Sequence, residues 1–289
     1  MTIEMEAIIS NSELQCNSEY GRLEKVLVCP PTFMSISEII NETQKHYAED
    51  NIDESLATKQ HRNFVAKMKE AGIEVINLEA LERFPEQVFT RDIGFTLGDI
   101  LFVSNMGSEV RHGEEQLFKN WLDEQGATYL PLTDNSIEGG DVIVDRDVIF
   151  VGISGRTSSE GIHKLAEATP GFTVQEIPID KSYLHLDCVF NVLSPTEALV
   201  FPPALRKEEL DYLATRYELI EVTKEEQFTM GTNVLSVGDK KVFSLPCNEK
   251  VNKDMRDRGY DVIEVDISEI IKSGGSFRCC TLPVKRSDI

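Results

Sequence analysis

Residues 88–103 read VFTRDIGFTLGDILFV, and this stretch establishes the pattern of the whole chain. Two runs rich in β-branched and aromatic residues flank a turn at residues 97–99, which predicts a β-hairpin. Apolar residues then recur at helical spacing over residues 114–125, up to Gly126, a residue typical of helix ends. The following segment, ATYLPL at residues 127–132, predicts one more strand. The unit is therefore a hairpin, a helix and a strand.

The same order of elements is expected three more times. Hairpins are predicted over residues 142–151, 189–201 and 234–244. Each is followed by a predicted helix, at residues 158–168, 207–215 and 248–258, and then by a predicted strand, at residues 172–179, 218–222 and 261–265. The four hairpins begin at residues 88, 142, 189 and 234, so the units are 54, 47 and 45 residues apart. Such regular self-similarity indicates a repeat architecture.

A fifth unit requires both ends of the chain. The run RCCTLPV at residues 278–284 has no later strand with which to form a hairpin, and the strand predicted at residues 23–28 has no earlier one. A helix near residues 56–71 and a strand at residues 72–78 complete this unit. Five units at a period of roughly 50 residues favour radial repetition, closed by joining the terminal strands. We therefore predict an α/β fold, a five-bladed ββαβ propeller in one domain over residues 1–289. The alternative, an open doubly wound sheet, would lack the hairpin in each unit.

Composition and charge narrow the range of functions. The 289 residues include 29 Lys plus Arg and 50 Asp plus Glu, a net charge of −21, which disfavours nucleic acid and anionic membranes as partners and permits a cationic substrate. No segment approaches the ~18 apolar residues of a membrane span. The first ten residues, MTIEMEAIIS, lack the basic region of a secretion signal. The six cysteines form no C-x-x-C pair, so we expect a reduced, cytoplasmic protein without structural zinc.

The residues that carry chemistry lie at the start of each unit. In chain order these starts are FTRD (89–92), EGGD (138–141), HLD (185–187), GTN (231–233) and RCC (278–280). Equivalent positions in a closed ring surround one axis. The repeat thus predicts that six side chains converge at one end of a central channel: Asp92, Glu138, Asp141, His185, Asp187 and Cys279.

This combination of side chains indicates a reaction class. A cysteine with a histidine forms a nucleophile and base pair, and a carboxylate beside the histidine raises its basicity. Several carboxylates in one small site repel one another unless the ligand brings positive charge. A planar guanidinium fits, because carboxylates bind its N–H edges in pairs and leave its central carbon open to attack by sulfur.

Each of these residues alone has a simpler explanation. A single cysteine is usually a small core residue, a single histidine on an apolar strand is usually structural, and Gly-Gly-Asp is common in turns. Cys188 and Cys280 compete with Cys279 as nucleophile, but strand alternation would place both on the face opposite the site. One histidine among acids is a poor transition-metal site, so no metal is expected. Residues that can carry chemistry stand at the same place in all five units, and this coincidence favours a catalytic site.

In this order, FTRD, EGGDV, HLD and GGSFRCCTLP resemble the motifs of the guanidine-modifying (pentein) superfamily, which includes dimethylarginine dimethylaminohydrolase, arginine deiminase and the amidinotransferases. The resemblance extends from about residue 21 to residue 285 and implies a five-fold ββαβ propeller. It implies that Cys279 is the nucleophile, that His185 is the general acid and base, and that Glu138 partners His185 or the guanidinium. Asp92 and Asp187 would hold the guanidinium nitrogens.

The superfamily also binds the substrate α-carboxylate through two arginines. Arg111 follows Asp92 by 19 residues and Arg156 follows Glu138 by 18, which matches the family spacing, so both arginines are predicted to bind substrate. Asp141 is grouped with the carboxylates that are predicted to bind substrate.

The resemblance implies a hydrolase that acts on the guanidinium of arginine or a methylated arginine through a covalent Cys279 thiouronium, giving citrulline and ammonia or an alkylamine. The compact length favours a dimethylargininase-like enzyme, whereas Asp92 together with Asp187 favours an unsubstituted guanidinium. An amidinotransferase, an arginine deiminase-type enzyme and a non-catalytic guanidine-binding protein stay open. No cofactor is expected. The expected partner is a small guanidino substrate, without nucleic acid or membrane, and a homodimer is left open.

Overall fold

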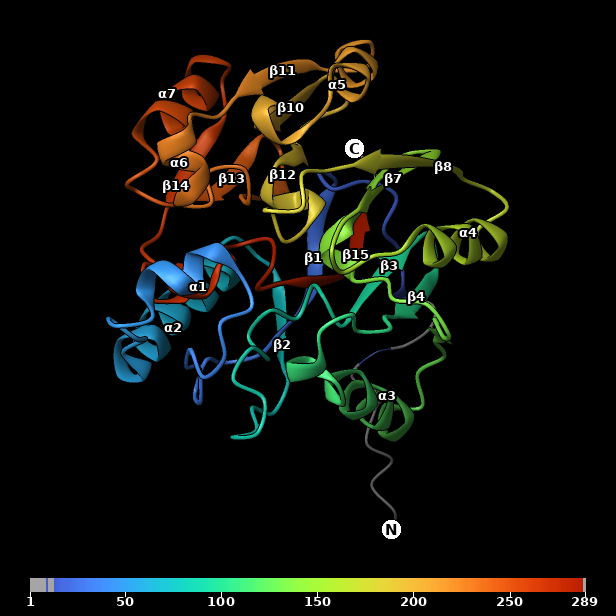
Figure 1. The fold of residues 1–289 in the computed structure, drawn as a ribbon, viewed down its shortest axis with the longest axis vertical. Coiled ribbons are helices and arrows are strands. Elements are labelled where there is room, and N and C mark those ends of the chain that lie inside the picture. The colour runs from blue at the N-terminus through green and yellow to red at the C-terminus, as the bar shows by residue number, and fades with distance from the viewer. Residues whose placement is uncertain (1–8, 10–12, 288–289) are drawn as a thin grey trace.

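The computed structural model describes residue 9 and residues 13–287, and Figure 1 shows their arrangement. The strands are β1 (Arg22–Val28), β2 (Glu74–Asn77), β3 (Gly94–Leu97), β4 (Ile100–Val103), β5 (Leu130–Pro131), β6 (Val142–Asp145), β7 (Val148–Ile153), β8 (Thr173–Pro178), β9 (Phe190–Val192), β10 (Glu197–Val200), β11 (Glu218–Glu221), β12 (Leu235–Gly238), β13 (Lys241–Ser244), β14 (Asp261–Glu264) and β15 (Leu282–Ser287). The helices are α1 (Glu42–Tyr47), α2 (Glu54–Glu70), α3 (Glu114–Gln125), α4 (Ser159–Ala168), α5 (Lys207–Ala214), α6 (Lys224–Phe228) and α7 (Glu249–Asp257). The 3₁₀ turns are η2 (Glu109–Arg111), η3 (Gly139–Asp141), η4 (Leu186–Cys188), η5 (Pro202–Ala204) and η6 (Ile270–Ser273).

The strands form five three-stranded sheets within the described residues. In each sheet an antiparallel pair of strands is extended by a third strand, which returns through a helical connection and runs parallel to the middle strand; four of these pairs are hairpins. The order hairpin, helix, strand that the sequence predicted is therefore present in each sheet. Strand hydrogen bonding does not join one of these sheets to the next, so their association depends on side-chain packing and isolated bridges such as Cys16 with Gly98.

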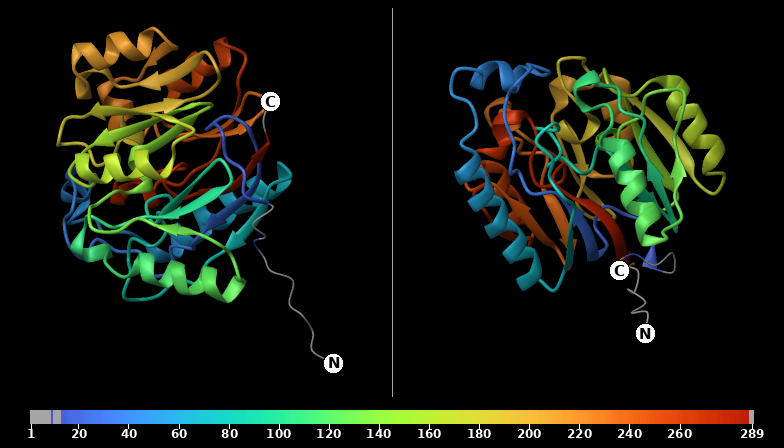
Figure 2. Two further views of the ribbon diagram at one scale, coloured as in Figure 1. Left: turned by 90° about the vertical axis from the view of Figure 1, so that its right-hand side faces the viewer. Right: turned by 90° about the horizontal axis from the view of Figure 1, so that it is seen from below.

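One sheet is built from both ends of the chain, as the sequence predicted. Strand β1 pairs antiparallel with β15, with Leu27 opposite Leu282, and parallel with β2. Figure 1 shows β1 and β15 near the middle of the molecule, and Figures 1 and 2 show the long helices around its outside. The two terminal strands thus lie side by side, and β15 begins three residues after Cys279.

Burial explains why these segments form these elements. The side chains of Val26, Leu27 and Val28 in β1 are fully buried, as expected of a strand covered on both faces. On the outside, the amphipathic helix α2 buries Phe64, which packs on Phe277 with ring centroids 5.0 Å apart. This contact anchors the chain two residues before Cys279. None of the helices among the described residues has the length and apolar character that a membrane span requires.

The unit starts differ from the prediction in their backbone. Residues 88–92 and 278–281 were expected to begin strands, but both segments are turns, and the strands begin only at Gly94 and Leu282. Short-range hydrogen bonds form these turns: the Asp92 amide donates to the Phe89 carbonyl at 3.2 Å and the Thr281 amide donates to the Arg278 carbonyl at 3.1 Å. The turns leave room for polar side chains to meet inside the fold.

Candidate active site

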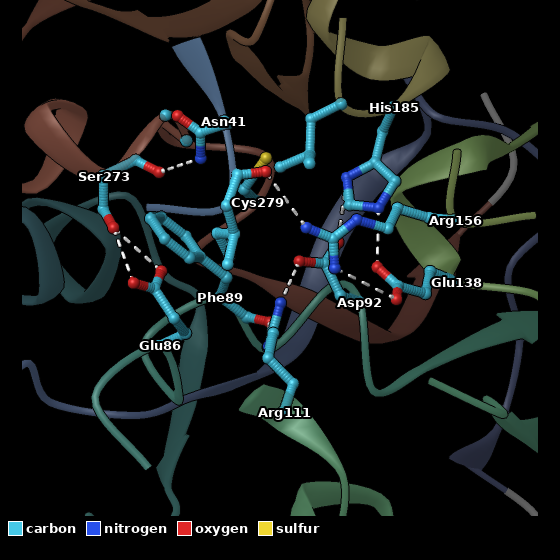
Figure 3. Close-up of a pocket in the computed structure, with 14 residues that line it drawn as sticks. Asn41, Glu86, Phe89, Asp92, Arg111, Glu138, Arg156, His185, Ser273 and Cys279 are labelled. Carbon is cyan, nitrogen blue, oxygen red and sulfur yellow. Dashed lines mark hydrogen bonds and ion pairs between the residues drawn. The ribbon is translucent and has the colours of Figure 1, made fainter. Parts of the chain in front are cut away.

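Residues from four of the five unit starts line a small buried cavity, shown in Figure 3, whereas the start at residues 231–233 does not line it. Its volume of about 10 Å³ is room for about one water molecule. Six of the eight residues predicted from the sequence line it: Asp92, Arg111, Glu138, Arg156, His185 and Cys279. The remaining lining residues are Ile40, Asn41, Glu86, Phe89, Leu184, Ser273, Gly274 and Gly275. In Figure 3, His185, Glu138 and Arg156 lie on one side and Glu86 and Ser273 on the other.

Two glycines allow neighbouring unit starts to approach each other. A Cβ atom on Gly139 would lie 2.1 Å from the Arg91 carbonyl oxygen, and one on Gly140 would lie 2.7 Å from both Asp92 Oδ1 and the His185 ring. Only glycine permits such contacts, because a larger residue would push the turn outward. The Gly-Gly pair therefore sets the distance from Glu138 to His185 and Asp92.

His185 lies between two carboxylates. Its Nε2 is 2.7 Å from Glu138 Oε2, and its Nδ1 is 3.6 Å from Asp92 Oδ1. The imidazole is almost fully buried. Burial alone would lower its pKa, but Asp92, Glu138 and Asp141 together raise the pKa of His185 to about 10. The ring is therefore protonated at neutral pH and able to donate a proton.

Cys279, the middle residue of the RCC unit start, is buried. Its Sγ donates to Asp187 Oδ2 at 3.5 Å, and its backbone amide donates to Asn233 Oδ1 at 3.1 Å. Burial and the negative charge of Asp187 raise the pKa of the Cys279 thiol well above its ordinary value. The sulfur is thus a neutral thiol in this arrangement, and a cation beside it would favour the thiolate.

Asp187 and Asp141 do not line the cavity, unlike the other predicted residues. Asp187 Oδ2 accepts a hydrogen bond from Arg278 Nη1 at 2.7 Å and the thiol of Cys279. Asp141 accepts from the Leu186 amide at 2.8 Å and from the Ser154 hydroxyl at 2.7 Å. Both carboxylates are occupied by protein donors.

Asp187 lies outside the cavity because of the backbone conformation after His185. Strand alternation predicted that Asp187 would share a face with His185 and that Cys188 would lie opposite, but residues 186–188 form the 3₁₀ turn η4. The turn directs Asp187 behind the cavity, where it contacts Cys279 and Arg278 instead of facing a ligand. The Cys188 thiol contacts the same carboxylate at 3.6 Å.

The two predicted carboxylate-binding arginines have different surroundings. All three Arg111 nitrogens are engaged: Nε and Nη2 donate to Glu114 at 3.1 and 2.7 Å, Nη2 donates to the Phe89 carbonyl at 3.0 Å, and Nη1 pairs with Asp92. Arg156 is held more loosely, because its Nη2 donates to the Ile40 carbonyl at 3.4 Å and its Nη1 lies 3.9 Å from Glu138 Oε1. Of the two arginines that were predicted to bind the substrate carboxylate, Arg111 is therefore fully bonded to the protein, and Arg156 is held only by long contacts.

Glu86 is a cavity residue that the sequence did not single out. Its carboxyl accepts from the Ser273 hydroxyl and from Gln44 Nε2, both at 2.8 Å. Burial raises the pKa of Glu86 to about 7, although the Ser273 hydrogen bond opposes the change. Glu86 precedes Asp92 by six residues and has no counterpart in the repeat, so no sequence signal marked it.

One group of side chains has the geometry of a metal site. Ligand atoms of Asp92, Glu138 and His185 all lie within 4.8 Å of one another. A metal ion there would have to displace the proton from His185 and compete with Arg111 for Asp92. Asp92 Oδ1, which has no hydrogen-bond donor among the described residues, is able to accept from an organic cation without either change.

Comparison with known proteins identifies relatives along nearly the whole chain. Residues 30–286 match the family described as N,N dimethylarginine dimethylhydrolase, eukaryotic. The chain is 49% identical over 279 residues to the protein YkgA of Bacillus subtilis, covering 96% of this chain and 98% of that protein. It is 27% identical over 267 residues to the N(G),N(G)-dimethylarginine dimethylaminohydrolase of Mycobacterium tuberculosis, with coverage of 91% and 86%.

Solved structures share the fold. The product-bound N-terminal domain of ArgZ, an arginine dihydrolase from the ornithine-ammonia cycle in cyanobacteria, matches with a TM-score of 0.83 and 25% identity, over 91% of this chain and 97% of that one. SxtG, an amidinotransferase from Microseira wollei, matches in fold with a TM-score of 0.83 and 18% identity, over 96% and 98%. With the motif order and the family match, these similarities show that the chain belongs to the dimethylarginine dimethylaminohydrolase family of the guanidine-modifying (pentein) superfamily.

Proposed function

We propose that the protein hydrolyses the guanidinium group of an arginine-type substrate, with a methylated arginine preferred, through a covalent thiouronium on Cys279. The observation that carries this proposal is the cavity shared by Cys279 and His185, whose ring nitrogens face Glu138 at 2.7 Å and Asp92 at 3.6 Å. A nucleophile, a proton carrier and an anionic surface thus lie around one small volume.

Substrate binding activates the nucleophile in this scheme. Asp92 Oδ1 is buried and has no hydrogen-bond donor among the described residues, so it is the acceptor for a guanidinium N–H. A guanidinium placed between Asp92 and Cys279 brings positive charge next to the sulfur. That charge offsets the burial and the Asp187 carboxylate that hold the pKa of the thiol high, so the thiol releases its proton to solvent and the thiolate forms with the substrate in place.

The covalent steps follow from the same residues. The thiolate of Cys279 attacks the guanidinium carbon, a C–S bond forms, and a tetrahedral adduct results. His185 donates its proton to the departing nitrogen, the C–N bond breaks, and ammonia or an alkylamine leaves a thiouronium on Cys279. Water then attacks that carbon while neutral His185 accepts its proton, the C–S bond breaks, and the ureido product and the thiol are released.

The position of Asp187 bears on methylation of the substrate. The sequence favoured an unsubstituted guanidinium because Asp92 and Asp187 together would pair with its nitrogens. Since Arg278 occupies Asp187, that carboxylate is withdrawn from the ligand, and fewer N–H groups of the guanidinium are matched by acceptors. A nitrogen that bears methyl groups then loses little binding, which supports the preference for methylated arginine, as does the name of the Mycobacterium tuberculosis relative.

Arg156 is the residue that we assign to the substrate α-carboxylate. Its contacts to Ile40 and Glu138 are long, at 3.4 and 3.9 Å, whereas the nitrogens of Arg111 are all bonded to the protein. Arg111 accordingly positions Asp92. Because the cavity has room for about one water molecule, Arg156 and the backbone at Ile40 have to separate for an amino acid to bind.

The test is product analysis by mass spectrometry after incubation with asymmetric dimethylarginine, arginine or agmatine, each with and without glycine as an acceptor. The expected result is citrulline with dimethylamine from dimethylarginine, and trapping of a thiouronium on the Cys279 peptide. A hundredfold preference for arginine would replace the proposal with an arginine deiminase-type activity. A new guanidino compound formed from glycine would indicate amidino transfer, and the absence of any product or adduct would leave a guanidine-binding protein.

A further inference from the structure

A cluster of three buried arginines lies outside the cavity, and only one of them, Arg278, is linked to the proposed reaction, through its hydrogen bond to Asp187. The arginine cluster consists of Arg91, Arg278 and Arg286, with relative exposures of 4%, 1% and 2%. Arg91 and Arg278 directly precede Asp92 and Cys279 in the sequence, yet neither lines the catalytic cavity. Arg286 is on β15, the strand that follows Cys279.

Glu19 is the acidic residue that the three arginines share. Its Oε1 accepts from Arg278 Nη2 at 3.0 Å, and its Oε2 is 3.8 Å from Arg91 Nη2. Despite burial, the positive charges of Arg278, Arg91 and Arg286 lower the pKa of Glu19 to about 2, which agrees with three guanidinium groups close around one carboxylate.

The hydrogen-bonding capacity of the cluster is not filled by the described residues. Four of its buried nitrogen atoms have no acceptor among them: Nε and Nη2 of Arg91, Nε of Arg278 and Nη2 of Arg286. A buried donor without an acceptor is costly, and more so when it carries charge. The remaining Arg278 nitrogens donate to Asp187, Glu19 and the Val142 carbonyl, so Arg278 cannot turn to satisfy the others without losing these bonds.

The charges of the arginine cluster, like its hydrogen bonds, are not balanced by the described residues. Three guanidinium groups face two described carboxylates, Glu19 and Asp187, which leaves an excess of one positive charge. Cys16 does not supply the missing negative charge, because burial raises the pKa of its thiol to about 12. Burial and the nearby charge of Arg278 lower the pKa of Arg91 to about 10, as expected of a guanidinium beside other cations. An uncompensated buried charge destabilises the fold.

We propose that the arginine cluster binds one small monovalent anion, of the size and charge of a halide, between Arg91, Arg278 and Arg286. One negative charge neutralises the excess, and a monatomic anion accepts several N–H bonds from different directions, which matches four donors on three side chains. The site is separate from the catalytic cavity, so the anion is a structural ligand of the folded chain. Its expected effect is on stability, because a ligand that binds only the folded state shifts unfolding by mass action.

The experiment uses the whole protein with bromide as the probe. Crystals in sodium bromide should show an anomalous peak in hydrogen-bond contact with at least two of the three arginines. In solution, Tm should rise by about 3 °C for each tenfold increase in bromide above its dissociation constant, at ionic strength held constant with gluconate. Arg91→Met should remove this halide dependence, and the exposed control Arg62→Met should retain it.

Two results would overturn the proposal. One is a crystal in bromide with no anomalous peak at the cluster, whether water or a carboxylate of the chain fills the position. The other is a halide response of Tm that is equal in wild type and Arg91→Met, since that response would come from general salt effects. The bromide crystal of the wild type decides the matter even if Arg91→Met does not fold.

Discussion

Replacing Glu138 by Gln should lower the pKa of His185 and leave the imidazole in place. The Glu138 Oε2 to His185 Nε2 contact of 2.7 Å is buried on both sides, so water does not screen it. Glutamine keeps an oxygen that accepts the Nε2 proton but loses the negative charge. The substitution therefore separates the electrostatic part of this contact from its geometry.

The magnitude follows from the geometry. A hydrogen bond to a charged partner contributes about 1 to 1.5 kcal/mol more than a neutral one, which corresponds to about one pKa unit. Coulomb's law at an effective dielectric constant of 20 sets an upper bound of about 4 kcal/mol for charges ~4 Å apart, or about three units. From a starting pKa of about 10, the pKa of His185 in Glu138→Gln should thus fall by about one to three units.

The assay is a histidine Cε1 NMR titration of wild type and variant. A matched control is Glu176→Gln, because Glu176 lies 3.4 Å from the largely exposed His163 and does not line the cavity that contains His185. The control should leave the His185 titration unchanged. If the pKa of His185 stays at its wild-type value in Glu138→Gln, or rises, then Glu138 does not hold the proton on His185, and its assigned part in acid catalysis is rejected.

Three further predictions concern other residues. Cys279→Ser should abolish turnover while Cys280→Ser, which lies outside the cavity, keeps most of it; equal loss in steady-state assays of both variants would contradict the assignment of the nucleophile. Arg156→Ala should raise KM for arginine-type substrates by about 10–100-fold and leave agmatine nearly unaffected, and an equal effect on both would reject the carboxylate contact. Glu86 has a folded-state pKa of about 7, raised above that of the unfolded chain, so its contribution to stability falls as pH rises from about 4.5 to 7. Urea unfolding should therefore show Glu86→Gln gaining about 3 kcal/mol over wild type between pH 4.5 and 8, and no pH-dependent gain would show that Glu86 ionises freely.

The hairpins and outer helices were predictable because each depends on local periodicity. The helix predicted at residues 114–125 coincides with α3, since Phe118 and Leu122 of its apolar stripe are buried and Gly126 adopts the left-handed conformation that ends it. The pairing of the terminal strands was also predictable, because a strand without a partner at each end left one arrangement that satisfied both. Local periodicity and the repeat are enough to predict these features, without information on other contacts between distant residues.

The interior of the site was less predictable, because the position of a residue in the repeat does not determine which partner its side chain binds. The Asp187 carboxylate is withdrawn from the cavity by Arg278, which is 91 residues later, and by a 3₁₀ turn that no pattern in HLD indicated. Arg111 is turned inward by Glu114, only three residues away, yet an Arg and a Glu at that spacing are common on exposed helices. In both cases the spacing located the residue but did not determine its bonding partner.

The sheet built from β1, β2 and β15 has a consequence for how the protein is made. Arg286 donates to the carbonyl of Gly21, 265 residues earlier, so this contact waits until almost the whole described chain has been translated. At about 5–20 residues per second, the apolar strand β1 spends roughly 15–50 s without β15 beside it. During that time β2 can pair with one edge of β1, while the other edge is open to intermolecular pairing. Cys279, the proposed nucleophile, emerges from the ribosome just ahead of β15, so strand pairing and assembly of the site occur together, late in translation of the described residues.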